Sequence, residues 1–245
     1  KDVDLSLNLA RAFRAPSLEE RFKYIDLGNF VRLGDPSLEP EKSYSADLGL
    51  RIWKSRFNLQ ADVFVNRLTN MIVEQPGEFV YRLTSESDPQ TIPALINANV
   101  RKALLYGFDL KFAYNFSRDF VLFGSGAYVR GLALETEGNL PLIPPLNGRL
   151  GIRYTNSGLG SAEFSVFGAG RQDKIAEGEQ ETPGYYRLDV ALNTKTMYLG
   201  PVGIQLFAGI DNITNNRYTN HLSTNRGDIS VEPGRNIYLR LKLSF

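Results

Sequence analysis

The fold is decided by the last ten residues of the chain, which read NIYLRLKLSF from Asn236 to Phe245. Every second residue of this stretch is apolar, from Ile237 to Phe245, and the residues between them are polar or amphipathic. Successive side chains of a β-strand point to opposite faces of the sheet. This period of two therefore predicts a strand with one apolar face and one polar face.

The same alternation recurs along the chain and predicts about ten strands in an all-β, antiparallel fold. It is clearest near residues 3–9, 44–52, 57–65, 108–114, 150–154, 188–192 and 202–210. Two further segments, 119–130 and 161–170, are β-like, but Phe123 and Phe167 obscure which face is apolar. Most of these strands are near the ten or so residues that cross a bilayer as a tilted β-strand.

The connections between these strands alternate regularly between long and short. The long ones are expected near 14–41, 70–97, 131–145, 171–183 and 213–233. The short ones are expected near 54–55, 117–118, 156–160 and 198–200. Outer-membrane β-barrels have short periplasmic turns and longer extracellular loops, so this asymmetry favours a transmembrane barrel.

Composition excludes several other classes of protein. The 245 residues contain no Cys and one His, which argues against disulfide scaffolds and against the common Cys- or His-based metal sites. The net charge of +1 gives no overall field that would attract nucleic acid. No stretch approaches the roughly 18 apolar residues of a membrane-spanning helix. A passive or adhesin-like barrel of about ten strands and a soluble β-sandwich remain as alternatives.

Four segments carry a resemblance to a known family. They are RAFRAPSLEE at 11–20, GDPSLEPEKS at 34–43, DNITNNRY at 211–218 and PGRN at 233–236, which leads into the terminal strand. Together, in this order and at strand junctions, they resemble the C-terminal part of the β-barrel of TonB-dependent outer-membrane receptors.

The resemblance implies a 22-stranded barrel whose lumen is filled by a plug. Residues 1–245 would be the C-terminal portion of that barrel, and the plug domain and the N-terminal strands would be absent from this sequence. The start at Lys1, without an initiator Met or a signal peptide, fits that expectation. The implied protein lies in a Gram-negative outer membrane, in contact with its lipid, and imports a scarce extracellular ligand, most often a ferric siderophore or another iron or metal complex. It would be coupled to the TonB complex through the plug, without being an enzyme and without a cofactor.

Aromatic and cationic residues in the predicted long loops are the candidate ligand-binding residues, because guanidinium groups bind anionic chelates and aromatic rings stack on planar ligands. They are Tyr81, Arg82, Arg130, Arg171, Tyr218, His221 and Arg226. For His221, a solvated loop histidine is the favoured alternative. Tyr185 and Tyr186 are instead expected in the aromatic girdle at the membrane interface.

The terminal Phe245 has two compatible interpretations. The resemblance implies that a terminal aromatic residue is read by the barrel-assembly machinery, whereas the strand pattern alone makes it a lipid-facing strand end. Carboxylates also recur on the predicted polar faces, at Asp47, Asp62, Asp109, Asp189 and Asp211. We expect them to balance cations of a lumenal wall, at Arg51, Lys111, Arg153, Arg187 and Arg240, rather than to form a catalytic pair.

Overall fold

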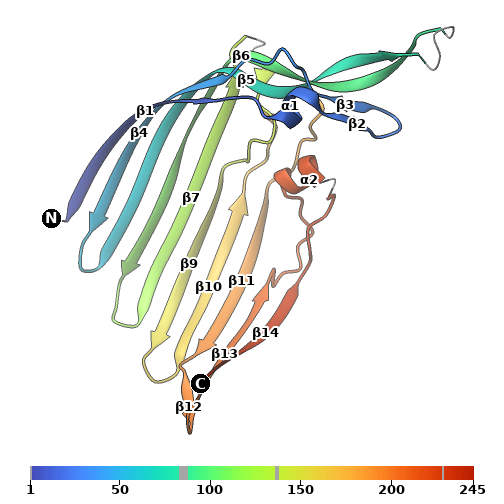
Figure 1. Cartoon of the computed structure of the whole chain (residues 1–245). Coiled ribbons are helices and arrows are strands. Elements are labelled where there is room, and N and C mark those ends of the chain that lie inside the picture. The colour runs from blue at the N-terminus through green and yellow to red at the C-terminus, as the bar shows by residue number, and fades with distance from the viewer. Residues whose placement is uncertain (1, 83–87, 136–137, 228) are drawn as a thin grey trace.

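A computed structural model describes residues 2–82, 88–135, 138–227 and 229–245 of the chain. These residues form a single 14-stranded sheet, which curves into an open wall (Figure 1). Neighbouring wall strands are antiparallel and follow one another in chain order. The predicted all-β, antiparallel barrel architecture is confirmed, and a sandwich of two packed sheets is not formed.

Ten strands make up the wall within the described residues. They are β1 (Val3–Arg14), β4 (Glu41–Trp53), β5 (Phe57–Tyr81), β6 (Gln90–Asn115), β7 (Phe120–Ala133), β9 (Asn147–Asn156), β10 (Gly160–Ala169), β11 (Tyr185–Thr194), β13 (Val202–Asp211) and β14 (Asn236–Ser244). The smaller elements are β2 (Tyr24–Asp26), β3 (Val31–Leu33), β8 (Gly138–Asn139), β12 (Met197–Leu199), α1 (Leu18–Phe22) and α2 (His221–Gly227).

The two faces of the wall differ in chemistry. One face, here called the outward face, exposes rows of aliphatic side chains such as Leu5, Leu7 and Leu9 of β1. The opposite face, here called the lumenal face, carries cross-strand ion pairs, for example between Arg51 and Asp62, whose Nη1 and Oδ1 atoms are 3.0 Å apart. Exposed aliphatic rows on a strand of this length suit contact with lipid, whereas the paired charges suit a wet lumen.

The structure also settles the two segments whose apolar face was obscured. Phe123 lies on the lumenal face, and the guanidinium groups of Arg149 and Arg153 lie over its ring at 5.7 and 5.1 Å from the centroid. Phe167 is covered by the Arg187 guanidinium in the same way, at 6.0 Å. These aromatic rings therefore belong to the polar wall, where cation–π contact rather than lipid surrounds them.

The two ends of the wall differ as the loop lengths predicted. The strands are joined by short turns at one end, whereas α1, α2 and the long connections gather at the other (Figure 1). By the usual arrangement of outer-membrane barrels, the end with the long loops faces outside, and we call it the extracellular end.

The expectation of a long loop over 70–97 was wrong for most of that segment. β5 continues to Tyr81 and β6 begins at Gln90, so the two strands project beyond the wall as a long hairpin (Figure 1). Strand pairing continues through Pro76, Gly77 and Pro93. β3 adds to this hairpin as the partner of β6 in a parallel pair, and it buries Val31 completely.

A small apolar core lies where this hairpin leaves the wall. Ala103, Ala133 and Leu140 are buried there, and Leu68 and Leu105 pack against them. Within the described ranges β1 and β14 do not pair with each other, so the sheet is open. Of the helices in these ranges, none has the length and apolar character required to cross a membrane.

Candidate functional site

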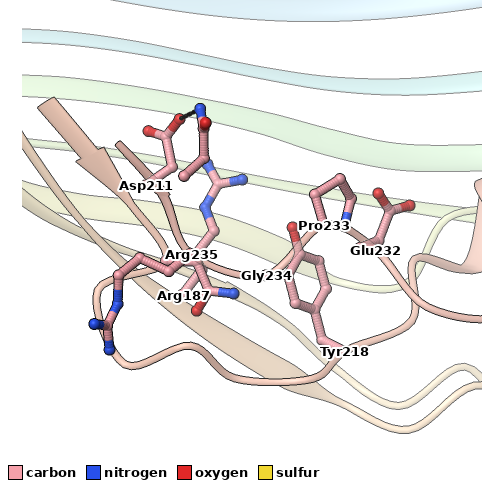
Figure 2. A pocket seen from close by; sticks show the side chains of 9 residues that line it. Arg187, Asp211, Tyr218, Glu232, Pro233, Gly234 and Arg235 are labelled. Carbon is pink, nitrogen blue, oxygen red and sulfur yellow. Dashed lines mark hydrogen bonds between the residues drawn. The ribbon is translucent and has the colours of Figure 1, made fainter. Parts of the chain in front are cut away.

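A cavity of about 520 Å³ opens on the lumenal face at the extracellular end of the wall. It lies between β11, the end of β13 and the segment that leads into β14. Figure 2 shows Asp211, Arg187 and Arg235 on one side of this cavity and Tyr218, Pro233 and Glu232 on the other.

The turn after β13 builds one wall of the cavity. Asn212 has a positive φ of 54°, which asparagine tolerates better than most residues. Its buried side chain closes the turn, because Nδ2 donates to the Asn216 carbonyl and Oδ1 accepts from the Asn216 amide, both at 2.9 Å. Asn215 Oδ1 in turn accepts the Arg235 amide at 2.8 Å. The DNITNN segment therefore fixes the chain entering β14 against the end of β13.

Aromatic residues form a shelf beside the cavity. The rings of Tyr185 and Tyr218 are stacked with their centroids 4.3 Å apart, and Phe167 lies 6.0 Å from Tyr185. Tyr185 shares the lumenal face with Arg187 and Asp189, two and four residues along β11. It is therefore not part of a lipid-facing girdle, whereas its neighbour Tyr186 projects from the opposite face and is exposed.

The cavity has mixed charge and many hydrogen-bonding groups. Arg187 is held by Asp189, with Nη2 and Oδ2 2.9 Å apart, while the structure gives Arg235 no ion-pair partner among the described residues. Asp211, Glu232 and the Tyr218 phenol add acceptors and a donor. This set of charged and hydrogen-bonding groups suits the binding of a polar ligand.

Three extracellular connections are joined to one another through the Glu179 carboxylate and the neighbouring Gln180. Its Oε1 accepts the Leu142 amide at 2.6 Å, and its Oε2 accepts the Ala176 amide at 2.9 Å. Asn225 of α2 adds a two-point contact with the backbone of Gln180, donating to its carbonyl and accepting from its amide. The loops that follow β8, β10 and β13 thus form one connected group, which we call the three-loop group.

His221 lies inside the three-loop group, so the expectation of a solvated histidine was wrong. It is 2% exposed, with Nδ1 3.2 Å from both Thr182 Oγ1 and Asn225 Nδ2. Among the described residues its Nε2 has no hydrogen-bond partner, and Glu179 Oε1 lies 3.9 Å from it. Burial lowers the pKa of His221, and the negative charge of Glu179 partly opposes this effect. We therefore give this side chain a role in joining loops rather than in contacting a ligand.

The other predicted ligand-binding residues do not converge on one site. Tyr218 alone lines the cavity described above. Tyr81 lies at the end of β5, where its hydroxyl donates to Gln90 Oε1 at 2.8 Å, and Arg82 follows it as an exposed residue. Arg226 is exposed in the last turn of α2.

Arg130 and Arg171 lie together at a second, smaller cavity of about 100 Å³. Arg171 is mostly exposed and pairs with Glu181, which raises the pKa of its guanidinium further. Arg130 is the cross-strand partner of Tyr106, and it therefore shares the outward face with that residue. Phe245 follows β14 and is 96% exposed at the opposite end of the wall.

Eight of the nine residues that line the larger cavity were not among the predicted ligand-binding residues. Asp211 and Arg187 were assigned to the lumenal wall, and Arg235 was noted only within the PGRN segment. The register of the last two strands brings these segments together, since Asp211 pairs with Asn236. The sequence did contain a signal for the cavity. The DNITNNRY and PGRN segments lie at the end of β13 and the start of β14, which are consecutive antiparallel strands.

A curved antiparallel wall with a lipid-compatible outward face, a charged lumenal face and extracellular loops around a polar cavity defines an outer-membrane β-barrel protein. Residues 1–213 match a family model described as TonB dependent receptor-like, beta-barrel. The chain belongs to this family, whose members are transporters of the Gram-negative outer membrane and not enzymes. Comparison with curated protein sequences finds no match.

Solved structures of TonB-dependent receptors have the same fold. The copper transporter OprC gives a TM-score of 0.77 at 24% identity over 99% of this chain and 37% of its own. A mutant of the ferric enterobactin receptor PfeA from Pseudomonas aeruginosa gives a TM-score of 0.75 at 18% identity, and the match covers 98% of this chain and 38% of the receptor. The siderophore receptor PirA from Acinetobacter baumannii gives a TM-score of 0.72 at 20% identity, and the match covers 100% of this chain and 39% of the receptor. The chain thus spans a little over a third of the length of these proteins.

Proposed function

We propose that the complete protein is a TonB-dependent transporter that imports a ferric siderophore or another metal complex, and that residues 1–245 supply the C-terminal part of its barrel. Family membership supports the transporter class. The solved structures with the same fold include receptors named for copper, for ferric enterobactin and for a siderophore, which supports a metal complex as cargo. Further strands and a plug, outside this chain, would close the lumen and contact TonB.

The observation that carries the proposal is the polar cavity at the extracellular end of the lumenal face. A ligand arriving from outside would meet the three-loop group first and then Tyr218, Arg187 and Arg235. Guanidinium and phenol groups donate hydrogen bonds to carboxylate, hydroxamate or catecholate oxygens of a metal chelate. The chain would then contribute affinity and a path, while energy for release would come through TonB.

The test is uptake of iron-labelled chelates by cells that depend on the full-length protein for growth under iron limitation. We expect Arg187→Gln, Arg235→Gln and Tyr218→Phe to weaken binding of the transported chelate, about tenfold for each arginine, because a charge-assisted hydrogen bond contributes roughly 1.5–3 kcal/mol. The exposed Arg118→Gln change in the turn after β6 is the matched control and should leave binding unchanged.

Two results would contradict the proposal. Uptake that persists without TonB would indicate a passive channel. An equal loss of binding in the cavity variants and in the Arg118 control would mean that the cavity residues do not bind the ligand. Truncation of Phe245, in contrast, is expected to lower the amount of assembled protein without changing the affinity of the molecules that do assemble.

A further inference from the structure

Five cations lie on the outward face of the wall near its extracellular end, one on each of five adjacent strands. They are Arg11 of β1, Lys42 of β4, Arg67 of β5, Lys102 of β6 and Arg130 of β7. Their faces follow from the strand alternation that places aliphatic residues such as Leu9 and Val65 outward. An outward cation in a lipid-facing row requires an explanation, because this face otherwise contacts hydrocarbon.

The strand register shows that the five side chains form one patch. Arg11 and Arg67 are the two cross-strand neighbours of Tyr44. One row closer to the loops, Lys42 and Lys102 are the two cross-strand neighbours of Thr69. Neighbouring strands lie about 4.8 Å apart, so five strands extend over roughly 20 Å. We call these five residues the outward cationic patch.

Aromatic residues on the same face give the depth of the patch in the membrane. Tyr44 lies between two of the cations, and Tyr106 is the cross-strand partner of Arg130. A second set of outward rings, including Tyr114 and Phe57, lies at the opposite end of the strands. From Tyr106 to Tyr114 is nine residues of β6, which is the length of a tilted strand across a bilayer. Aromatic belts mark the two interfaces, so the patch lies at the headgroup level of the outer leaflet.

Few carboxylates oppose the patch. Lys102 Nζ lies 3.7 Å from Glu135 Oε1, and this is the one ion pair that the five cations make with the described residues. The Arg11 guanidinium lies over the Tyr44 ring at 5.4 Å instead. Four of the five charges therefore have no protein counter-charge in the described part of the chain, and they are placed where an anionic headgroup would supply one.

We propose that the outward cationic patch binds the phosphates of a phosphorylated glycolipid in the outer leaflet. Guanidinium and ammonium groups make short, charge-assisted bonds to phosphate oxygens. The acyl chains of the same lipid would lie along the aliphatic rows of β1 and β5 below the patch, which include Leu7, Leu9, Val63 and Val65. This site is on the opposite face of the wall from the ligand cavity, and it assigns Arg130 to lipid rather than to cargo.

The test measures lipid A bound to the full-length receptor in detergent, by native mass spectrometry and by titration with a fluorescent lipid A. We expect the R11Q/K42Q/R67Q variant to bind bisphosphorylated lipid A at least about tenfold more weakly, since 1.4 kcal/mol corresponds to a factor of ten and three charged contacts are lost. Enzymatically dephosphorylated lipid A should bind the parent protein as weakly as bisphosphorylated lipid A binds the triple variant.

The matched control is K54Q/R56Q/R118Q, which removes three exposed cations from the turns at the opposite end of the wall. It should bind lipid A like the parent. If the patch variant binds like the parent, if the control loses as much affinity, or if dephosphorylation has no effect, the proposal is wrong. Should the triple variant not assemble, Arg67→Gln alone is expected to weaken binding about threefold and Arg67→Lys to restore it. Unchanged binding by Arg67→Gln would equally overturn the site.

Discussion

Gly151 of β9 shows how a single residue makes room on the lumenal wall. A Cβ atom at this position would lie 2.4 Å from Phe123 Cζ and 2.8 Å from the Phe164 carbonyl oxygen. The Phe123 ring, which lies beneath the Arg149 and Arg153 guanidinium groups, can occupy this place because the residue below it has no side chain. The glycine is thus needed for the aromatic ring and its two cations rather than for an unusual backbone angle.

We expect Gly151→Ala to destabilise the assembled barrel by about 1–3 kcal/mol, because overpacking forces the ring or the neighbouring strand to move. Urea unfolding of the full-length protein in detergent, followed by gel mobility, measures this change. Gly126→Ala on β7 is the control, since its new Cβ would meet its nearest atom at 3.9 Å, an ordinary contact. Equal losses at the two positions would contradict the account.

Glu20 and His221 make the stability of two extracellular regions depend on pH over different ranges. The bonds from Arg14, together with those from Ser17, lower the pKa of Glu20 from 4.5 to about 2. Its contribution to stability is therefore complete above pH 4.5 and is lost as the pH falls from 4.5 toward 2. Burial lowers the pKa of His221 below 6.5, so the closed three-loop group favours neutral imidazole. The stability that the neutral His221 gives to the three-loop group is complete above pH 6.5. It is lost as the pH falls below 6.5 through the lowered pKa of the folded protein.

Between pH 7.5 and 5 we therefore expect the three-loop group to loosen while the α1 region keeps its structure. Residues 1–245 contain no Cys, so spin labels placed in this part of the protein meet no native thiol of the same part. One pair of labels is placed at Glu177→Cys with Arg226→Cys and a second pair at Glu19→Cys with Glu78→Cys. The distance distribution of the first pair should broaden on acidification and that of the second should not. His221→Asn should remove the pH response of the first pair. A response that survives this substitution would exclude His221 as its cause.

The long β5–β6 hairpin is held to the wall by the segment that precedes β4. Asn99 Nδ2 donates to the carbonyls of Asn70 and Glu39 at 2.7 and 3.1 Å, and its Oδ1 accepts the Glu39 amide at 2.8 Å. Asn70 has a positive φ of 58°, and its Nδ2 donates to Glu39 Oε2 at 2.8 Å. The geometry of the chain at this bend thus depends on two amide side chains and one glutamate.

We expect Asn99→Ala to increase hydrogen exchange of the hairpin segment 72–81 about tenfold, since three hydrogen bonds are lost at a partly buried position. Exchange is measured by mass spectrometry on the full-length protein in detergent. Asn8→Ala, which removes a hydrogen bond to Asp47 within the wall, is the control and should leave segment 72–81 unchanged. Slow exchange of 72–81 in the Asn99 variant would mean that strand pairing alone holds the hairpin.

This hairpin also shows where sequence reasoning ends. The alternation predicted the wall strands because lipid on one side and water on the other impose it on each strand. Above the membrane both faces of β5 and β6 meet protein or water, so residues such as Pro76 and Pro93 interrupt the pattern while the pairing continues. The register between Val31 and Ala94 is a contact between distant segments, and no local pattern contains it.

For a related reason, the sequence predicted only some of the residues of the candidate site. Tyr218 could be named because it is an aromatic residue in a predicted long loop, but its cavity neighbours Arg187 and Asp211 looked like ordinary members of a charged wall. The cavity depends on the pairing of β13 with β14, which aligns Asp211 with Asn236. His221 was misjudged because its burial arises from three loops that meet in space, through Glu179 and Thr182.

The outward face of β14 gives the most direct test of membrane insertion. Ile237, Leu239, Leu241 and Leu243 project outward along this strand, and all four are exposed. Within a bilayer, an arginine costs about 2–4 kcal/mol at the midplane and about 0–1 kcal/mol near either interface. A substitution series along the strand should therefore report depth, whereas a water-facing surface would tolerate each arginine about equally.

We expect Leu239→Arg and Leu241→Arg to lower the unfolding free energy of the full-length protein in lipid vesicles by about 2–4 kcal/mol, and Ile237→Arg and Leu243→Arg by about 1 kcal/mol or less. Urea titrations in phospholipid vesicles measure the four values. The lumenal Lys242→Leu change is the control for altering charge on the same strand, and it should cost less than either central substitution because it places no charge in lipid. A flat profile across the four outward positions would mean that this face does not contact hydrocarbon, and the assignment of the outward cationic patch to headgroup depth would then fail with it.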